Sequence, residues 1–354
     1  MKKKYLITTF VLMMQLASCS FTAVDQNQDS ANEVANEEMS GTDGKVGGTL
    51  VIYSGRKESL VADIISDFEA TSGVEVEVRY AKSAELAGTI LLEGAISPAD
   101  IFFSQDPISL GVVAKEGLFE TLPDDILASV PSWASDKKGY WVGTSGRSRS
   151  LVIDTRDVTP EELPNDIYGL ADEKFRNRLG LAPTNSSFIA MVSCMIELDG
   201  EEKVLDWLSS INSLDYTEYP KNSPQVVAVD SGELDIGLVN HYYTLRLLAE
   251  NGDSSIKNVY LVSGCGAMVM PAGVGILSSS QNKTSAKAFI EFLHSKSVQE
   301  TFTNSLYEFP LVKGIEHNDL LPNLENLNSP SNLNWSALAI WQEKAVELIA
   351  RSGF

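Results

Sequence analysis

The sequence predicts an α/β fold of two lobes with a ligand cleft between them. Apolar runs of strand length alternate with helical periodicity from residue 49 onward, a pattern typical of parallel sheets covered by helices. The alternation begins again near residue 180 without a sequence repeat, which indicates a second α/β unit. The chain has 354 residues, 44% of them hydrophobic, so it can bury two such cores. Ligands of such folds bind beyond the carboxyl ends of the strands.

The first unit begins with Thr49–Ser54, a continuous apolar run of strand length. A helix is expected next, because apolar residues recur at helical spacing from Leu60 to Phe68. Alternation predicts a strand over 74–78. A helix is expected over 84–93, and a third, buried strand over 100–103.

The second unit repeats this order of elements. Strands are expected over 180–182 and 234–240, helices over 188–198, 203–208 and 225–229, then a strand over 275–277 and helices over 286–293 and 335–350. The folded body, 49–354, is expected to divide into lobe 1, about 49–145 plus part of 265–320, and lobe 2, about 146–264 plus the C-terminal helix.

The N-terminal segment predicts export. Basic residues precede an apolar run too short for a mature membrane helix, and the run closes with the sequence LASC at 16–19. This resembles a bacterial lipobox, so residues 1–18 are expected to be a lipoprotein signal peptide and Cys19 the lipidated mature N-terminus. An ordinary signal peptide with a chance cysteine is the alternative. The polar, acidic residues of 19–48 then form a disordered tether, and the lipid is the only expected membrane contact.

Composition excludes several classes of protein. The chain has 27 basic and 48 acidic residues, a net charge of −21, which argues against nucleic-acid binding. Three His and three Cys are too few for a zinc cluster or a disulfide framework, so any metal site must use oxygen. Cys194 and Cys265 can pair in an oxidising compartment, but two buried thiols are the favoured state. A monomer is expected.

Polar loops follow the predicted strands and lead into helices. They contain Ser54 and Arg56, the run 183–187, and the run 219–224, where Ser223 is a good N-cap and Pro224 suits the first helical position. If these loops share one cleft, their free amides favour an anion. Ordinary helix capping explains any one loop alone.

Two adjacent phenols, Tyr242 and Tyr243, end a buried strand. A break in the strand at that point can direct both into the cleft, whereas a continuing strand would direct them to opposite faces. Phenolate is a hard anionic oxygen donor that suits a trivalent cation such as iron(III). The alternative is that both rings are packing aromatics. His241 beside them is interpreted as structural.

Several segments spread along the chain are similar to those of one bacterial family. They are VIYSGRKE at 51–58, SPADIFF at 97–103, SGRSR at 145–149, APTN at 182–185, VNHYY at 239–243 and YEFPLV at 307–312. By these motifs the chain resembles the ferric-ion-binding proteins, substrate-binding subunits of ABC-type iron(III) importers. The resemblance extends from residue 49 to the terminal helix and implies the two-lobed periplasmic-binding-protein fold.

The resemblance also implies roles for individual residues. Tyr242 and Tyr243 are then the Fe³⁺ ligands, and a synergistic anion, carbonate or phosphate, completes the shell. The positions that hold the anion match Asn185, Asn222 and Asn240. An arginine at the cleft matches Arg147.

The chain departs from the family pattern at three places. The first loop, with Ser54 and Arg56, lacks a histidine ligand, Gln105 and Asp106 stand where some members place a glutamate ligand, and Phe188 replaces a third tyrosine. Because strong ligands are missing while Arg56 and Arg147 add positive charge, we expect iron affinity to depend strongly on the anion.

The favoured function is an extracytoplasmic iron(III)-binding lipoprotein that captures Fe³⁺ with a synergistic anion and delivers it to an ABC permease. An alternative keeps the fold but binds a small organic anion, a phosphonate or carboxylate, with the tyrosines as pocket walls. An exported enzyme is disfavoured, since no nucleophile–base pair or carboxylate pair stands out at the strand ends.

Overall fold

The structure is a computed structural model that describes residues 48–252, 254–327, 329–330 and 333–354. The expected signal peptide over 1–18, Cys19 and all of the 19–48 tether except Gly48 lie outside the described residues. Among the described helices, none combines the length and the apolar character needed to cross a bilayer.

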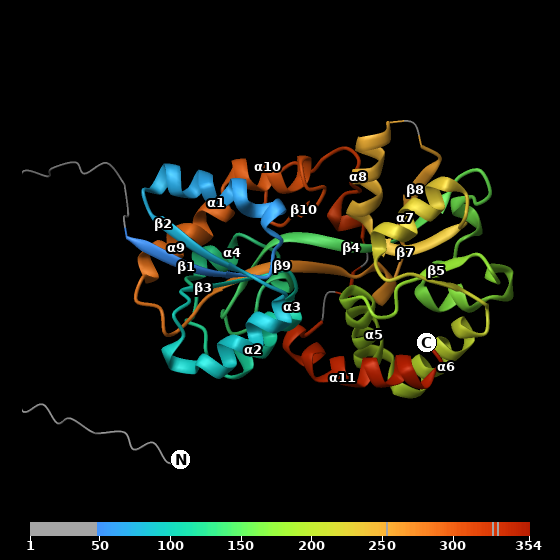
Figure 1. The fold of residues 1–354 in the computed structure, drawn as a ribbon, viewed down its shortest axis with the longest axis horizontal. Coiled ribbons are helices and arrows are strands. Elements are labelled where there is room, and N and C mark those ends of the chain that lie inside the picture. The colour runs from blue at the N-terminus through green and yellow to red at the C-terminus, as the bar shows by residue number, and fades with distance from the viewer. Residues whose placement is uncertain (1–47, 253, 328, 331–332) are drawn as a thin grey trace, which may run out of the picture. The chain divides into compact units, whose positions relative to one another are not determined.

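The described strands form one hydrogen-bonded path, in the order β2-β1-β3-β9-β4-β7-β5-β6, with β8 and β10 also paired to β4 (Figure 1). The strands are β1 (Thr49–Ser54), β2 (Glu75–Tyr80), β3 (Ile101–Ser104), β4 (Val142–Asp154), β5 (Leu179–Leu181), β6 (Thr217–Glu218), β7 (Ile236–Asn240), β8 (Ile256–Val259), β9 (Val269–Ile276) and β10 (Phe309–Pro310).

Helices follow most of these strands, which confirms the expected α/β class. They are α1 (Glu58–Ser72), α2 (Ser83–Glu93), α3 (Pro107–Lys115), α4 (Asp124–Ala128), α5 (Ser186–Asp199), α6 (Glu201–Asn212), α7 (Asn222–Ser231), α8 (His241–Asn251), α9 (Lys283–Leu293), α10 (Lys296–Asn304) and α11 (Trp335–Arg351), with the short 3₁₀ turn η6 (Cys265–Ala267) before β9.

Two groups of parallel strands are joined by antiparallel crossing strands. β1 pairs in parallel with β2 and β3, and β5 pairs in parallel with β6 and β7. The first half of β4 pairs with β9 and β10, whereas its second half pairs with β7 and β8. Every residue of β4 is buried, and Figure 1 shows the strand running from one group to the other. Because it belongs to both groups, β4 carries buried side chains from one α/β unit into the other.

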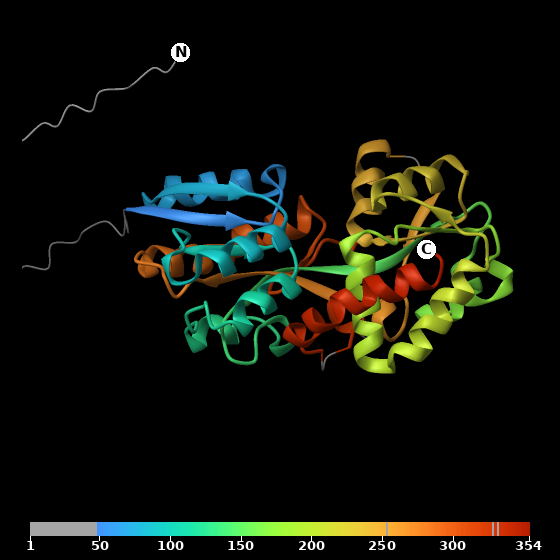
Figure 2. The same ribbon diagram turned by 60° about the horizontal axis from the view of Figure 1, so that its bottom comes forward.

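The C-terminal helix α11 packs against both groups, contacting α3 on one side and α5 and α6 on the other, and Figure 2 shows it crossing between them. At its start, the indole Nε1 of Trp335 donates to the Trp133 carbonyl at 2.7 Å. Beyond its end, the ring of Phe354 stacks on Tyr216 with centroids 4.8 Å apart. The helix is thus anchored at both ends.

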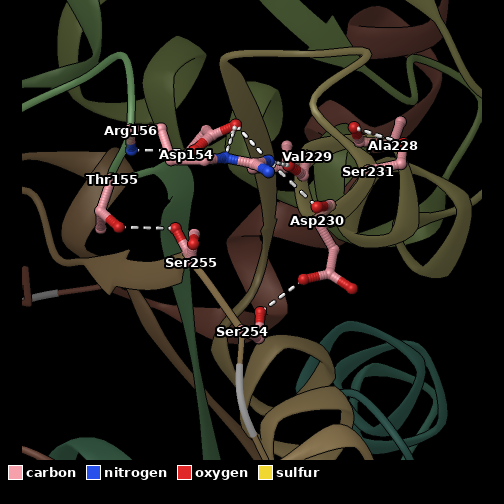
Figure 3. A network of polar contacts seen from close by, with 9 residues as sticks. All are labelled: Asp154, Thr155, Arg156, Ala228, Val229, Asp230, Ser231, Ser254 and Ser255. Carbon is pink, nitrogen blue, oxygen red and sulfur yellow. Dashed lines mark hydrogen bonds and ion pairs between the residues drawn. The ribbon is translucent and has the colours of Figure 1, made fainter.

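A polar network fixes the end of β4 (Figure 3). Arg156 Nε donates to Asp154 Oδ1 at 2.8 Å, and its Nη2 donates to the carbonyl of Asp230, in α7, at 3.1 Å. Thr155 Oγ1 donates to the carbonyl of Ser255, just before β8, at 2.7 Å. This end of β4 is therefore held to both α7 and the β8 segment.

Two sequence expectations are wrong. Cys194 in α5 and Cys265 in η6 form a disulfide with Cα atoms 5.8 Å apart, not two free thiols. Packing of α5 against η6 brings these distant positions together, which sequence spacing does not reveal. Helix α7 starts at Asn222, with Lys221 as its N-cap, so Ser223 and Pro224 lie inside the first turn.

Candidate functional site

The carboxyl ends of three parallel strands lie at one edge of the sheet. β5 lies between β6 and β7, and each of these strands is followed by a helix that starts at this edge, namely α5, α7 and α8 (Figure 1). Backbone N–H groups at a helix N-terminus lack intrahelical partners and carry partial positive charge. This edge therefore combines three termini that favour negative charge.

Tyr242 and Tyr243 lie on the first turn of α8, directly after β7 ends at Asn240. Their ring centroids are 4.4 Å apart, so the strand does break and the two phenols stay together. The guanidinium of Arg246, one helical turn later, lies 4.8 Å from the Tyr242 ring centroid. The structure thus supplies the adjacent oxygen donors that the sequence suggested.

The surroundings of Tyr243 keep it protonated when no cation is bound. Burial, the neighbouring Tyr242 and a hydrogen bond with it raise the pKa of Tyr243, while the charges of Arg147 and Arg246 oppose the rise. A cation that binds this phenol as phenolate must therefore displace its proton.

His241 is a structural residue at the start of α8. Its Nδ1 lies 3.1 Å from the Ser148 backbone nitrogen, and its Nε2 lies 2.7 Å from the Tyr307 carbonyl oxygen. Burial lowers its pKa to about 4, so the ring is neutral, accepts from Ser148 and donates to Tyr307. Because both ring nitrogens are occupied, His241 connects β4 to the chain before β10 and has no free atom for a metal.

Asn240 and Asn185, two of the expected anion-holding residues, are brought together by Arg149. Its Nη1 donates to Asn240 Oδ1 at 2.9 Å and to Ser187 Oγ at 3.0 Å. Ser187 in turn donates to Asn185 Oδ1 from its hydroxyl, at 2.6 Å, and from its backbone nitrogen, at 3.0 Å. Asn185 is thereby the N-cap of α5.

Arg149 was missed as a site residue, because its signal appears only once β4 is known to be a buried strand. Arg147 and Arg149 are two residues apart in one strand, so their side chains share a face. A charged residue in a wholly buried strand indicates a specific partner.

Asn222 is the first residue of α7 and is 2% exposed. Its Oδ1 is buried and has no hydrogen-bond partner in the described part of the chain. The third expected anion-holding residue thus lies at the same edge of the sheet, at the N-terminus of its own helix.

Arg147 connects the two strand groups. It lies on β4 and donates from Nη2 to the carbonyl of Gln105, just after β3. Its charge also acts on Tyr243 in α8. The side-chain Oε1 of Gln105 is buried with no partner among the described residues. Arg147 therefore stands between the phenols and the end of β3.

Three other expected residues bond within the first strand group. Arg56 is fully buried, and its Nη2 donates to Glu308 Oε1 at 3.1 Å and Oε2 at 3.0 Å. Ser54 Oγ donates to the carbonyl of Arg56 at 3.1 Å. Asp106 caps α3, accepting from the Ser109 backbone nitrogen at 2.8 Å. We expected Arg56 in the anion shell, but its guanidinium instead pairs with the buried carboxylate of Glu308.

The donor set of the site consists of oxygen atoms and N–H groups. In the described residues, no group of three or more His, Cys, Asp or Glu side chains is placed to hold a metal ion. Phenols beside helix N-termini suit a hard cation together with an anion. Two α/β units joined by crossing strands, with this site at the strand ends, define a solute-binding protein of the periplasmic-binding-protein fold.

Comparison with known proteins agrees with this class. A family model described as "Bacterial extracellular solute-binding protein" matches residues 97–339. The major ferric iron-binding protein of Neisseria meningitidis serogroup B is 33% identical, over 86% of this chain and 92% of its own length. The Fe(3+)-binding periplasmic protein of Serratia marcescens is 32% identical, over 86% and 90%.

Solved structures give the same result. Iron-bound HitA from Pseudomonas aeruginosa matches with a TM-score of 0.79 and 29% identity, covering 86% of this chain and 99% of that chain. The chain therefore belongs to the bacterial extracellular solute-binding proteins, a non-catalytic family, and within it to the ferric-iron-binding periplasmic proteins of iron ABC transport.

Proposed function

We propose that this protein binds Fe³⁺ outside the cytoplasm through Tyr242 and Tyr243. The observation that carries the proposal is the pair of phenols on the first turn of α8, with ring centroids 4.4 Å apart, where three helix N-termini meet. Two phenolates suit a hard trivalent cation far better than a soft or divalent one. The ferric-iron names of the relatives support the same cargo.

A synergistic oxyanion, carbonate or phosphate, completes the iron shell in this proposal. Two phenolates neutralise two of the three charges of Fe³⁺ and leave coordination positions open. The anion is held by Asn185, Asn222 and Asn240 and by the backbone N–H groups of the three helices. Arg147, between Gln105 and Tyr243, adds positive charge.

The proposal places the protein at the cell membrane, tethered by a lipid on Cys19 and the segment up to residue 48, where it delivers iron to an ABC permease. A tether of this length allows the folded body to move between capture and docking. The mass of the mature N-terminal peptide tests the anchor, since a lipobox predicts cleavage before Cys19 and acyl chains on it.

The first prediction concerns the phenols. Fe³⁺ supplied as a weak chelate is titrated into the full mature chain in detergent, with and without carbonate or phosphate, while the visible phenolate-to-iron absorption band is followed. We expect saturation at about one iron per chain, only with an anion present. The paired change Tyr242→Phe and Tyr243→Phe should abolish the band, because phenylalanine has no oxygen donor.

The matched control is Tyr216→Phe, since the Tyr216 ring packs on Phe354 and not in the site. It should leave the band unchanged. Equal iron binding in buffer free of carbonate and phosphate would contradict the synergistic anion. Absence of the band under every anion would contradict iron binding and favour the small organic anion, with both tyrosines as pocket walls.

A further inference from the structure

We propose that Arg149 is a positioning residue that fixes the anion pocket as a set of hydrogen-bond donors, and that the bound oxyanion supplies its missing counter-charge. The inference rests on the proposed function and deepens it. Arg149 holds the amide oxygen of Asn240 toward itself and, through Ser187, fixes the amide oxygen of Asn185. Both amide NH₂ groups are then free to donate hydrogen bonds to the ligand.

Arg149 contacts Asn240 directly. Arg149 is 2% exposed, and its Nη1 lies 2.9 Å from Asn240 Oδ1. A guanidinium only donates hydrogen bonds, so the Asn240 atom that faces it must be the oxygen. A further bond from Nη2 to the Leu238 carbonyl, at 3.0 Å, holds the guanidinium against β7. The orientation of the Asn240 amide is therefore set by Arg149.

Arg149 positions Asn185 through Ser187. Its hydroxyl oxygen accepts from Arg149, so its proton is free to go to Asn185 Oδ1, 2.6 Å away. The backbone nitrogen of Ser187 donates to the same Oδ1. Because both bonds need an acceptor, the Asn185 oxygen also faces inward. One buried arginine thus orders two asparagines at the starts of two different helices, α5 and α8.

The NH₂ groups of Asn185 and Asn240 are left for a ligand. Within the described residues neither makes a hydrogen bond to the protein, and neither is among the buried polar atoms that lack a partner. Asn185 and Asn240 therefore present donors to the ligand, together with the N-termini of α5 and α8. Oxyanions accept from such donors, whereas cations and hydrogen-bond donors do not.

The charge of Arg149 has no counter-charge among the described side chains. Two other arginines near β4, Arg56 and Arg156, each pair with a carboxylate, Glu308 and Asp154. Among the described residues Arg149 has no carboxylate within salt-bridge distance, and its Nε has no hydrogen-bond partner. An uncompensated buried charge is costly, so an anion at the adjacent pocket stabilises it.

The test is calorimetric titration of inorganic phosphate into the iron-free, full mature chain in detergent. Arg149→Lys keeps the charge but has only one nitrogen, whereas Arg149 uses two, Nη1 for Asn240 and Ser187 and Nη2 for the Leu238 carbonyl that holds the guanidinium in place. We expect its phosphate affinity to fall at least about tenfold. Arg156→Lys is the matched control, since Arg156 bonds Asp154 and the end of α7 (Figure 3), and its affinity should not change.

Asn240→Asp is a second variant, which tests the inference even if Arg149→Lys does not fold. Arg149 keeps an oxygen acceptor in it, while an oxygen replaces the NH₂ group that faces the ligand. We expect it to fold and to lose phosphate binding. Melting curves separate a structural role from the proposed one, since a purely structural Arg149 predicts a lower melting temperature for Arg149→Lys but unchanged affinity in the folded protein.

The outcomes separate this inference from the proposed function. Wild-type affinity in both folded variants would overturn the role of Arg149 and leave iron binding intact. Phosphate binding that depends on Arg149 in a chain that shows no iron band would support the role and contradict the iron proposal. A wild-type chain that binds no phosphate, with or without iron, would overturn the donor pocket itself.

Discussion

The buried pair of Arg56 and Glu308 holds the end of β1 to the segment before β10. Both side chains are 0% exposed, the charged atoms are 3.0 Å apart, and Ser145 Oγ on β4 donates to the same carboxylate at 2.5 Å. Burial raises the pKa of Glu308, but the charges of Arg56 and Arg147 and the bond from Ser145 outweigh it and hold the pKa below the ordinary 4.5. The pair thus joins three segments near the crossing strand.

Glu308→Gln should lower the free energy of unfolding by about 3–5 kcal/mol at pH 7, because it leaves the Arg56 charge buried without a partner. The sign of the pH dependence follows from the lowered pKa of Glu308. The pair stabilises the fold above pH 4.5 and loses this effect as the pH falls further. Urea unfolding at pH 7 and in the acid range should show the gap between wild type and variant narrowing on acidification.

The double variant Arg56→Met, Glu308→Met is the matched control. Replacing both charges leaves no buried ion, so it should cost much less than Glu308→Gln alone. An equal loss in both variants would show that packing, not charge pairing, carries the effect.

At the scale of single residues, the sequence predicted the site best where a residue type has few chemical roles. Two adjacent tyrosines after a buried strand predicted a pair of oxygen donors, and they lie side by side. Arg56 and Arg147 both looked available for an anion, but only Arg147 stays next to a phenol. The difference depends on Glu308, which is 252 residues away from Arg56, and no local pattern links the two.

Among the elements, β4 shows most clearly what local sequence patterns do not predict. A continuous apolar run predicted β1, and helix-like sequence patterns predicted α2 and α11, almost to the residue. The sequence of β4 is polar and Gly-containing over its first half, so it lacked a strand signal, yet all its residues are buried. Its stability comes from partners on both sides, which single-sequence reasoning does not see.

The disulfide acts at the scale of elements, because it joins α5, whose N-terminus holds Asn185, to η6. It closes a loop with a sequence separation of 71. Loop-closure entropy gives a stabilisation of about 4 kcal/mol for such a loop. We expect reduction of the purified protein by a phosphine to lower the free energy of unfolding by about that amount, measured by guanidinium denaturation.

Cys194→Ser with Cys265→Ser provides the control for this prediction. The variant should have the lowered stability from the outset and should not respond to the phosphine. A wild-type protein whose mass and stability do not change on reduction would show that the bond is not formed in solution.

In the whole molecule, the residues proposed for the site come from both strand groups. The tyrosines and the three helix N-termini belong to the group around β7, whereas Gln105 follows β3 in the other group. Arg147 on the shared strand β4 touches Gln105 and acts on Tyr243, so it contacts one group and influences the other. A ligand that bonds to both groups gains contacts when the two groups approach each other, and β4 is the strand that pairs with both groups.

We therefore expect Fe³⁺ with its anion to make the folded body more compact. Small-angle X-ray scattering on a secreted Cys19→Ser chain should show a smaller radius of gyration with iron and phosphate together than with either alone, because only the complete shell engages both strand groups. The Tyr242→Phe, Tyr243→Phe chain should show no such change. An unchanged radius in a wild-type chain that carries the iron band would mean that the residues around β7 hold the ligand alone, and that Gln105 and the end of β3 take no part in binding.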